Sequence, residues 1–172
     1  MKWILWIVLT IVTLAILVTL IGWLLPVKHV ASRTGFYKEP PEAVWQAITN
    51  IEAMPSWRKG LKSVERLPDH DGLPAWVEHN SDGTMPMQTV EREPPKRLVV
   101  RIADPKLSFG GTWTYEITPA AGGSALRITE NGEVYNPFFR FVSRFVIGEN
   151  RTIEDYLTSL AGKLGDVPRI GK

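Results

Sequence analysis

An uninterrupted apolar segment near the amino terminus constrains this chain more than any other feature. Trp3 to Leu25 is a run of 23 residues without a charge. At about 1.5 Å per residue, such a helix would be about 35 Å long, enough to cross a hydrocarbon layer of about 30 Å. Trp3, Trp6 and Trp23 lie near its two ends, where indole rings favour the membrane–water interface. The segment therefore predicts a transmembrane helix.

A cleaved signal peptide is the alternative interpretation of this segment. Signal peptides have an apolar region of about 7–15 residues, followed by a cleavage site of small residues. The run in this chain is longer, and in the exit sequence LLPVKHVAS the residues Lys28 and His29 occupy positions where small residues are required. We therefore expect residues 1–27 to remain as a single-pass anchor in the cell membrane.

The sequence leaves open on which side of the membrane the rest of the chain lies. Lys2 precedes the apolar segment, whereas Lys28, Arg33 and Lys38 follow it. The excess of positive charge after the segment favours the cytoplasmic side. The absence of cysteine is compatible with either redox compartment.

The remaining part of the chain has the size of one ordinary domain. We place this domain at residues 28–165 and expect residues 166–172 to form a flexible tail. The formal net charge of the whole chain is +2, and its basic residues are dispersed over predicted strands and turns. This pattern does not favour nucleic acid as a partner.

The domain opens with a short strand and two short helices. We expect a first strand over Val30 to Tyr37, which ends at Glu39-Pro40-Pro41. The prolines then mark a helix start, because proline costs little at the first helical position. Apolar residues recur at helical spacing from Ala43 to Ile48. Pro55, in the stretch MPSW, prevents fusion of this helix with a second short one over residues 51–60.

From Leu61 to Tyr135 the pattern changes to short alternating runs that are separated by glycine, proline, aspartate and asparagine. Such a series predicts an antiparallel meander of six strands. The runs are LKSVERL, LPAWVEH, TMPMQTVERE, RLVVRIAD, TWTYEITP and SALRITENGEVY.

Helical periodicity returns after Asn136-Pro137 and continues to about Leu164. An apolar stripe begins with Phe138, Phe141 and Phe145, and it resumes after Gly148-Glu149-Asn150. Because glycine disfavours helix by about 1 kcal/mol relative to alanine, we expect a bend or break at that tripeptide.

This order of elements resembles the helix-grip fold of the START-like superfamily, and in particular the membrane-anchored bacterial SRPBCC proteins of the polyketide cyclase/dehydrase group. The resemblance covers about residues 30–164. It is carried by EPPEAVWQAITN, MPSW, EREPPKRLVVRI, GGTWTYEITPAAGGSALRITENGEV and the Phe-rich closing helix. It implies an α+β fold in which a seven-stranded antiparallel sheet curls around a long C-terminal helix. None of these motifs is a catalytic signature, so function follows from the resemblance only by analogy.

Within that fold, an apolar cavity is expected between the sheet and the helix, closed at one end by the two short helices. Large apolar residues on inward-facing positions would line it or form the core beside it. The candidate ligand-binding residues are Trp57, Trp76, Val100, Trp113, Tyr115, Ile128, Phe138, Phe141 and Phe145.

The chain lacks the sequence patterns of metalloproteases, serine hydrolases, P-loop enzymes and dinucleotide-binding enzymes. The histidines His29, His70 and His79 are scattered, so we predict neither a metal site nor a cofactor. Glu130 is the candidate catalytic residue, because strand alternation from Leu126 and Ile128 places it inside, where burial would raise its pKa.

Two alternatives for Glu130 remain open at this stage. A bulge at Asn131-Gly132 would turn the carboxylate outward, or a cation such as Arg127 or Arg144 would pair with it.

Three functions are compatible with these observations. The first is membrane-tethered binding of a hydrophobic small molecule or lipid. The second is an enzyme of the cyclase or dehydrase type that uses Glu130 or a tyrosine such as Tyr115. The third is a structural or partner-binding module whose cavity is filled by its own side chains.

Overall fold

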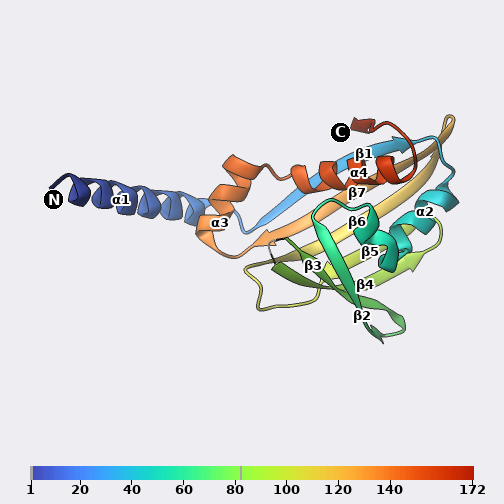
Figure 1. The fold of residues 1–172 in the computed structure, drawn as a ribbon, viewed down its shortest axis with the longest axis horizontal. Helices are drawn as coiled ribbons and strands as arrows, with labels where there is room; N and C mark the ends of the chain where they lie inside the picture. Colours follow the sequence, from blue (N-terminus) through green and yellow to red (C-terminus); the bar gives the residue numbers. More distant parts are fainter. Residues whose placement is uncertain (1, 82) are drawn as a thin grey trace.

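A single long helix projects from a domain made of one curved sheet and a packed helix (Figure 1). The computed structural model describes residues 2–81 and 83–172. Helix α1 (Lys2–Leu24) has only Gly22 buried, and it is long and apolar enough to cross a membrane. Its exposed Leu, Ile and Val side chains have no protein to pack against along most of its length.

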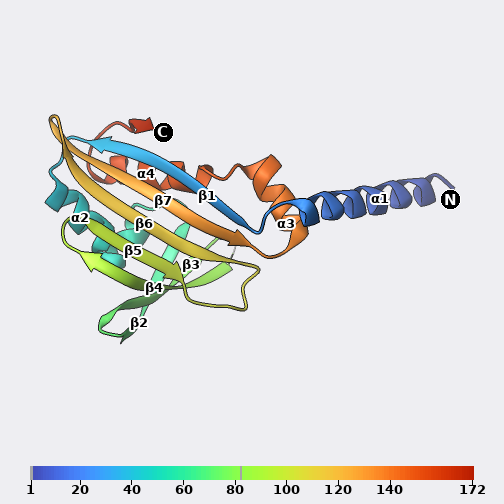
Figure 2. The ribbon, with the colours of Figure 1, turned by 180° about the vertical axis from the view of Figure 1, so that it is seen from behind.

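The sheet is antiparallel throughout and follows the predicted meander (Figure 2). Its order is β2-β3-β4-β5-β6-β7-β1-β8, so the first strand of the domain closes the meander by pairing with the last long strand. The strands are β1 (Lys28–Tyr37), β2 (Leu61–His70), β3 (Leu73–Asn80), β4 (Gly83–Glu93), β5 (Arg97–Ile102), β6 (Phe109–Ala120), β7 (Gly123–Val134) and β8 (Ile170–Gly171).

Two short helices join β1 to β2, as predicted. Helix α2 (Pro41–Thr49) begins with proline and buries Val44, Trp45 and Ile48. The 3-10 helix η1 (Ile51–Ser56) follows at once, and the Asn50 side chain accepts a hydrogen bond from the Ala53 amide at its start. The corner between α2 and η1 therefore closes one end of the domain with apolar side chains.

Helix α4 (Arg151–Lys163) is the element that the sheet surrounds. One face of α4 is completely buried, and it consists of Ile153, Tyr156, Leu157, Leu160 and Ala161. The Tyr37 hydroxyl of β1 donates a hydrogen bond to the Leu157 carbonyl at 3.2 Å. Gly35 lies beside this contact, and a Cβ there would meet the Leu157 side chain at 3.0 Å. The absence of a side chain at Gly35 thus allows α4 to lie close to β1.

The Phe-rich half of the predicted closing helix does not lie against the sheet. The helix is interrupted at Gly148, where φ is +86°, as the sequence predicts. The segment before this break forms helix α3 (Pro137–Val142) and the π-helical turn η2 (Ser143–Ile147). Helix α3 packs against the end of α1, so only α4, the second half of the predicted long C-terminal helix, is surrounded by the sheet (Figure 1).

The last residues differ from the predicted flexible tail. The Asp166 carboxylate accepts a hydrogen bond from the Lys38 amide at 2.9 Å, and Ile170–Gly171 pairs with Thr34 and Gly35. The sheet therefore has eight strands, one more than predicted, because these two residues add a short edge strand to β1.

The packing of α4 leads to a stability prediction. Leu160 is fully buried, so Leu160→Ala should lower the free energy of unfolding by about 2–5 kcal/mol through lost burial and a new cavity. Thr158→Ala, on the exposed face of the same helix, should change it by less than about 0.5 kcal/mol. Urea unfolding followed by near-UV circular dichroism measures both; equal effects would show that α4 is not the packed core of the domain.

Candidate functional site

A cavity of about 860 Å³ lies between the concave face of the sheet and α4. Helices α2 and η1 contribute Ile48, Ile51 and Met54 to one end. At the other end, the wall contains Phe109 from the start of β6 and Ile147 from the end of η2. The cavity thus runs from the two short helices towards the side of the domain where α1 is attached (Figure 1).

Strand alternation and register explain most of the wall. Val100 of β5 lies opposite Trp113 of β6, and Trp113 lies opposite Glu130 of β7. Since side chains at paired positions share a face, all three point to the same side of the sheet. Met85 and Met87 of β4 extend this apolar surface.

The structure brings together four of the nine predicted ligand-binding residues. Trp76, Val100, Trp113 and Tyr115 line the cavity, and their role in binding stays a prediction. Ile128 is fully buried in the core cluster.

The other four predicted residues lie elsewhere. Trp57 packs edge-on against Tyr156, with 5.4 Å between the ring centroids. Phe138 and Phe141 lie outside the cavity wall on α3, which packs on α1, and Phe145 lies outside the wall on η2.

A buried ion pair in the cavity wall was not predicted from the sequence. Glu78 of β3 is 1 % exposed, and its Oε1 accepts hydrogen bonds from Arg58 Nη1 at 2.5 Å and from Trp76 Nε1 at 3.2 Å. Within residues 2–81 and 83–172, Oε2 of Glu78 is buried without a hydrogen-bond partner. Strand alternation places Glu78 on the same face as the apolar Trp76, so its inward direction could have been predicted. Arg58 lies in an irregular segment after η1, and the direction of its side chain cannot be predicted from sequence periodicity.

Two tyrosines adjoin this pair. The Arg58 guanidinium lies over the Tyr156 ring, 5.4 Å from its centroid, and the Tyr115 and Tyr156 rings are 5.6 Å apart. Burial raises the pKa of both phenols well above the ordinary value of 10.0. Both hydroxyls are therefore neutral near pH 7 and keep their protons for hydrogen bonds.

Glu130 faces the cavity, as strand alternation predicts. β7 pairs with β6 without a break through Asn131 and Gly132, so no bulge turns the carboxylate outward. His29 of β1 lies beside it, with His29 Nε2 3.6 Å from Glu130 Oε1. Pairing with Arg144 is also wrong, because Arg144 binds Glu149.

Gly132 makes the approach of His29 to Glu130 possible. A Cβ at Gly132 would overlap the imidazole ring of His29. Burial raises the pKa of Glu130 above its ordinary value of 4.5, and the neighbouring His29 opposes this shift in part. Oε2 of Glu130 is buried and has no hydrogen-bond partner among the residues that the structure describes, so the carboxyl group can hold or release a proton inside the cavity.

The burial of the Arg58–Glu78 ion pair leads to a prediction about the free energy of unfolding. Arg58→Met leaves the Glu78 carboxylate buried without its cation, and we expect a loss of about 3–5 kcal/mol in the free energy of unfolding. Lys59→Met removes an exposed partner of Asp155 and should cost less than about 1 kcal/mol. Chemical unfolding of both variants gives the comparison. The double variant Arg58→Met/Glu78→Met should recover most of the loss, and failure to recover it would contradict this account.

The raised pKa of Glu130 makes a prediction about pH. The folded state binds this proton more tightly than the unfolded state does, so the stability from Glu130 is present below pH 4.5 and is lost as pH rises through the folded-state pKa. Glu130→Gln, which cannot ionise, should therefore gain thermal stability relative to the native chain between about pH 4 and pH 7. The melting temperatures of the native chain and of Glu130→Gln, measured at both pH values, test this expectation. Glu52→Gln, at an exposed position, is the control. A Glu130→Gln difference that does not change with pH would refute it.

Comparison with known proteins agrees with this architecture. The chain matches the family model described as "Polyketide cyclase / dehydrase and lipid transport" over residues 33–165. No curated protein matches it.

Several solved structures share the fold. A START superfamily protein from Mycobacterium smegmatis aligns with a TM-score of 0.65 at 17% identity, covering 80% of this chain and 97% of its own. The protein TTHA0849 from Thermus thermophilus aligns with a TM-score of 0.62 at 19% identity, covering 80% and 96%. The di-domain ARO/CYC StfQ from the steffimycin biosynthetic pathway aligns with a TM-score of 0.61 at 14% identity, covering 81% of this chain and 53% of its own. These likenesses concern the fold, and the family match covers most of the chain: the protein has a START-like helix-grip domain and belongs to the polyketide cyclase/dehydrase and lipid transport family.

Proposed function

We propose that this chain is a single-pass membrane protein that holds a hydrophobic small molecule or lipid in the cavity between its sheet and α4. The observation that carries the proposal is the cavity itself. Its volume of about 860 Å³ falls within the range of about 300–1,000 Å³ that is typical of small-molecule sites. A domain whose cavity was filled by its own side chains would not leave this space, so the purely structural alternative is disfavoured.

The chemistry of the wall favours an apolar ligand with a small polar group. Trp76, Trp113 and Met87 offer apolar surface, and burial of ligand surface against them stabilises a complex by about 25 cal/mol per Å², less the cost of ordering. Arg58 and Tyr115, with their hydrogen-bonding groups, also belong to the wall and would orient a polar end of the ligand.

The anchor supports the same function. A ligand that dissolves in the membrane remains close to a domain attached through α1, and this attachment raises its effective concentration at the cavity. A freely diffusing domain would have to capture such a ligand from water, where apolar molecules are scarce.

Filling the cavity should abolish binding. Ile102 and Val99 lie on β5 on opposite faces, and only Ile102 lines the cavity. In Ile102→Trp the added ring occupies ligand space, so native mass spectrometry of the full chain released from lipid nanodiscs should detect much less bound molecule than in the native protein. The matched control Val99→Trp should retain its ligand. Equal occupancy in both variants, or no bound molecule in the native chain, would refute the proposal.

Catalysis of a proton transfer is the second candidate function, and the position of Glu130 favours it. Its carboxyl group lines the cavity, carries a raised pKa and has an unpartnered oxygen. An enzyme would convert its substrate only while Glu130 can exchange a proton. The molecule recovered from Glu130→Gln would then differ in structure from that recovered from the native chain, and tandem mass spectrometry would detect this by fragmentation even where a proton shift leaves the mass unchanged. A carrier without catalysis should yield the same molecule from both.

A further inference from the structure

The α3–η2 segment exposes a group of apolar side chains that the domain does not cover. Phe139 is 50 % exposed, Phe145 60 %, Val146 71 % and Ile147 52 %. Such a concentration of large exposed apolar residues on one short segment of a folded domain marks an interaction surface.

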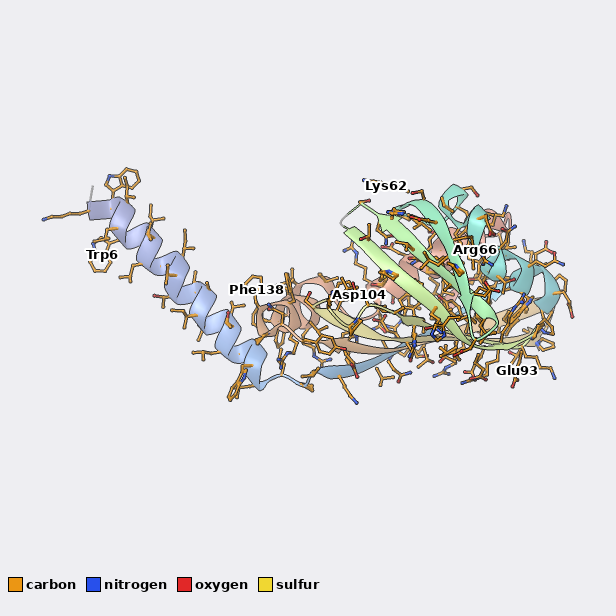
Figure 3. The ribbon with its side chains drawn as sticks, turned by 90° about the horizontal axis from the view of Figure 1, so that it is seen from below. Trp6, Lys62, Arg66, Glu93, Asp104 and Phe138 are labelled. Atoms are coloured by element: carbon orange, nitrogen blue, oxygen red, sulfur yellow. The ribbon has the colours of Figure 1, made fainter. Side chains whose placement is uncertain are left out.

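The position of this segment indicates what covers it. Gly22, in the last turn of α1, lies so close to Pro137 that a Cβ at Gly22 would overlap the Pro137 carbonyl. The Arg140 guanidinium donates a hydrogen bond to the Leu25 carbonyl at 2.8 Å, and so satisfies a backbone acceptor at the end of α1. α3 is therefore fixed to α1 by direct packing, and Figure 3 shows Phe138 beside the end of that helix.

This attachment sets the level of the segment relative to a membrane. α1 is apolar up to Leu24, and its contact with α3 includes Gly22 in its last turn. If α1 crosses a bilayer, the α3–η2 segment lies at the boundary between the acyl chains and the headgroups. An apolar face with neighbouring arginines, in this segment Arg140 and Arg144, is the composition of helices that lie in that boundary.

We infer that the α3–η2 segment is a second membrane contact, with Phe139, Phe145 and Val146 inserted into the lipid bilayer beside α1. The inference rests on the proposed membrane anchoring by α1 and goes beyond it. Ile147 belongs both to this exposed segment and to the cavity wall, and Phe109 lies at the same end of the cavity. The end of the cavity at Ile147 thus faces the membrane surface, and an apolar ligand passes between bilayer and cavity with little exposure to water.

Site-directed spin labelling of the full chain tests the inference. The native sequence contains no cysteine, so a single introduced cysteine is labelled uniquely. Val146→Cys reports on the α3–η2 segment, Leu14→Cys on the middle of α1, and Glu93→Cys on the exposed end of β4, far from α1 (Figure 3). The full chain is placed in phosphatidylcholine nanodiscs, and power saturation measures the access of oxygen, which concentrates in lipid, and of a water-soluble nickel chelate.

We expect the Val146 label to have a ratio of oxygen to nickel access that lies clearly above that of the Glu93 label and below that of the Leu14 label, because the segment lies at the boundary and Leu14 lies at the centre of the bilayer. A Val146 label that is as accessible to nickel as the Glu93 label would overturn the inference. A label shielded from both reagents would also overturn it, because a protein partner or second copy would then cover the segment. A Leu14 label exposed to nickel would instead refute the membrane anchoring on which both proposals depend, so the two failures are distinguishable.

Discussion

The close packing of α4 against one side of the sheet is the constraint on which the rest of the structure depends. Gly35 permits this approach, and the buried face from Ile153 to Ala161 holds it. One helix fills only part of the space that a curved sheet encloses. The side chains of β3, β4 and β5 consequently face α4 across a cavity rather than interlocking with it. The domain gains stability where α4 covers the concave face, and the part of this face that α4 does not fill leaves room for the proposed ligand.

Burying polar groups in this cavity lowers the stability of the domain, and the neighbours of each polar group offset part of that loss. The Glu78 carboxylate is stabilised by Arg58 and Trp76, whereas Glu130 has His29 beside it and a raised pKa. In the part of the chain that the structure describes, each carboxylate keeps one buried oxygen without a hydrogen-bond partner. Buried acceptors of this kind are destabilising unless a donor reaches them. A ligand with a hydroxyl or similar donor would supply what the protein leaves unsatisfied.

The sequence predicts the fold well because the fold depends on local signals. Alternation from Trp113 to Ile117 and the prolines around α2 specify strands and corners without reference to distant residues. The site is less predictable. Alternation placed Glu130 correctly, but the direction of Arg58 depends on an irregular segment.

The Phe-rich stripe of α3 and η2 was recognised as apolar, yet periodicity does not reveal whether a sheet, another helix or lipid covers an apolar face. The edge pairing of Ile170 was missed because a two-residue strand has no period.

The central claim is that an apolar ligand enters the cavity beside Trp76 and Trp113. Fluorine NMR of the full chain in nanodiscs tests this claim most directly. Every tryptophan is fluorinated, and a stearic acid that carries a nitroxide on its acyl chain is added. The account predicts that the Trp76 and Trp113 resonances broaden, as those of Trp3 and Trp23 in α1 do, and that they broaden more than that of Trp45, which is buried on α2 and does not line the cavity. Trp76 and Trp113 resonances as sharp as that of Trp45 would contradict it.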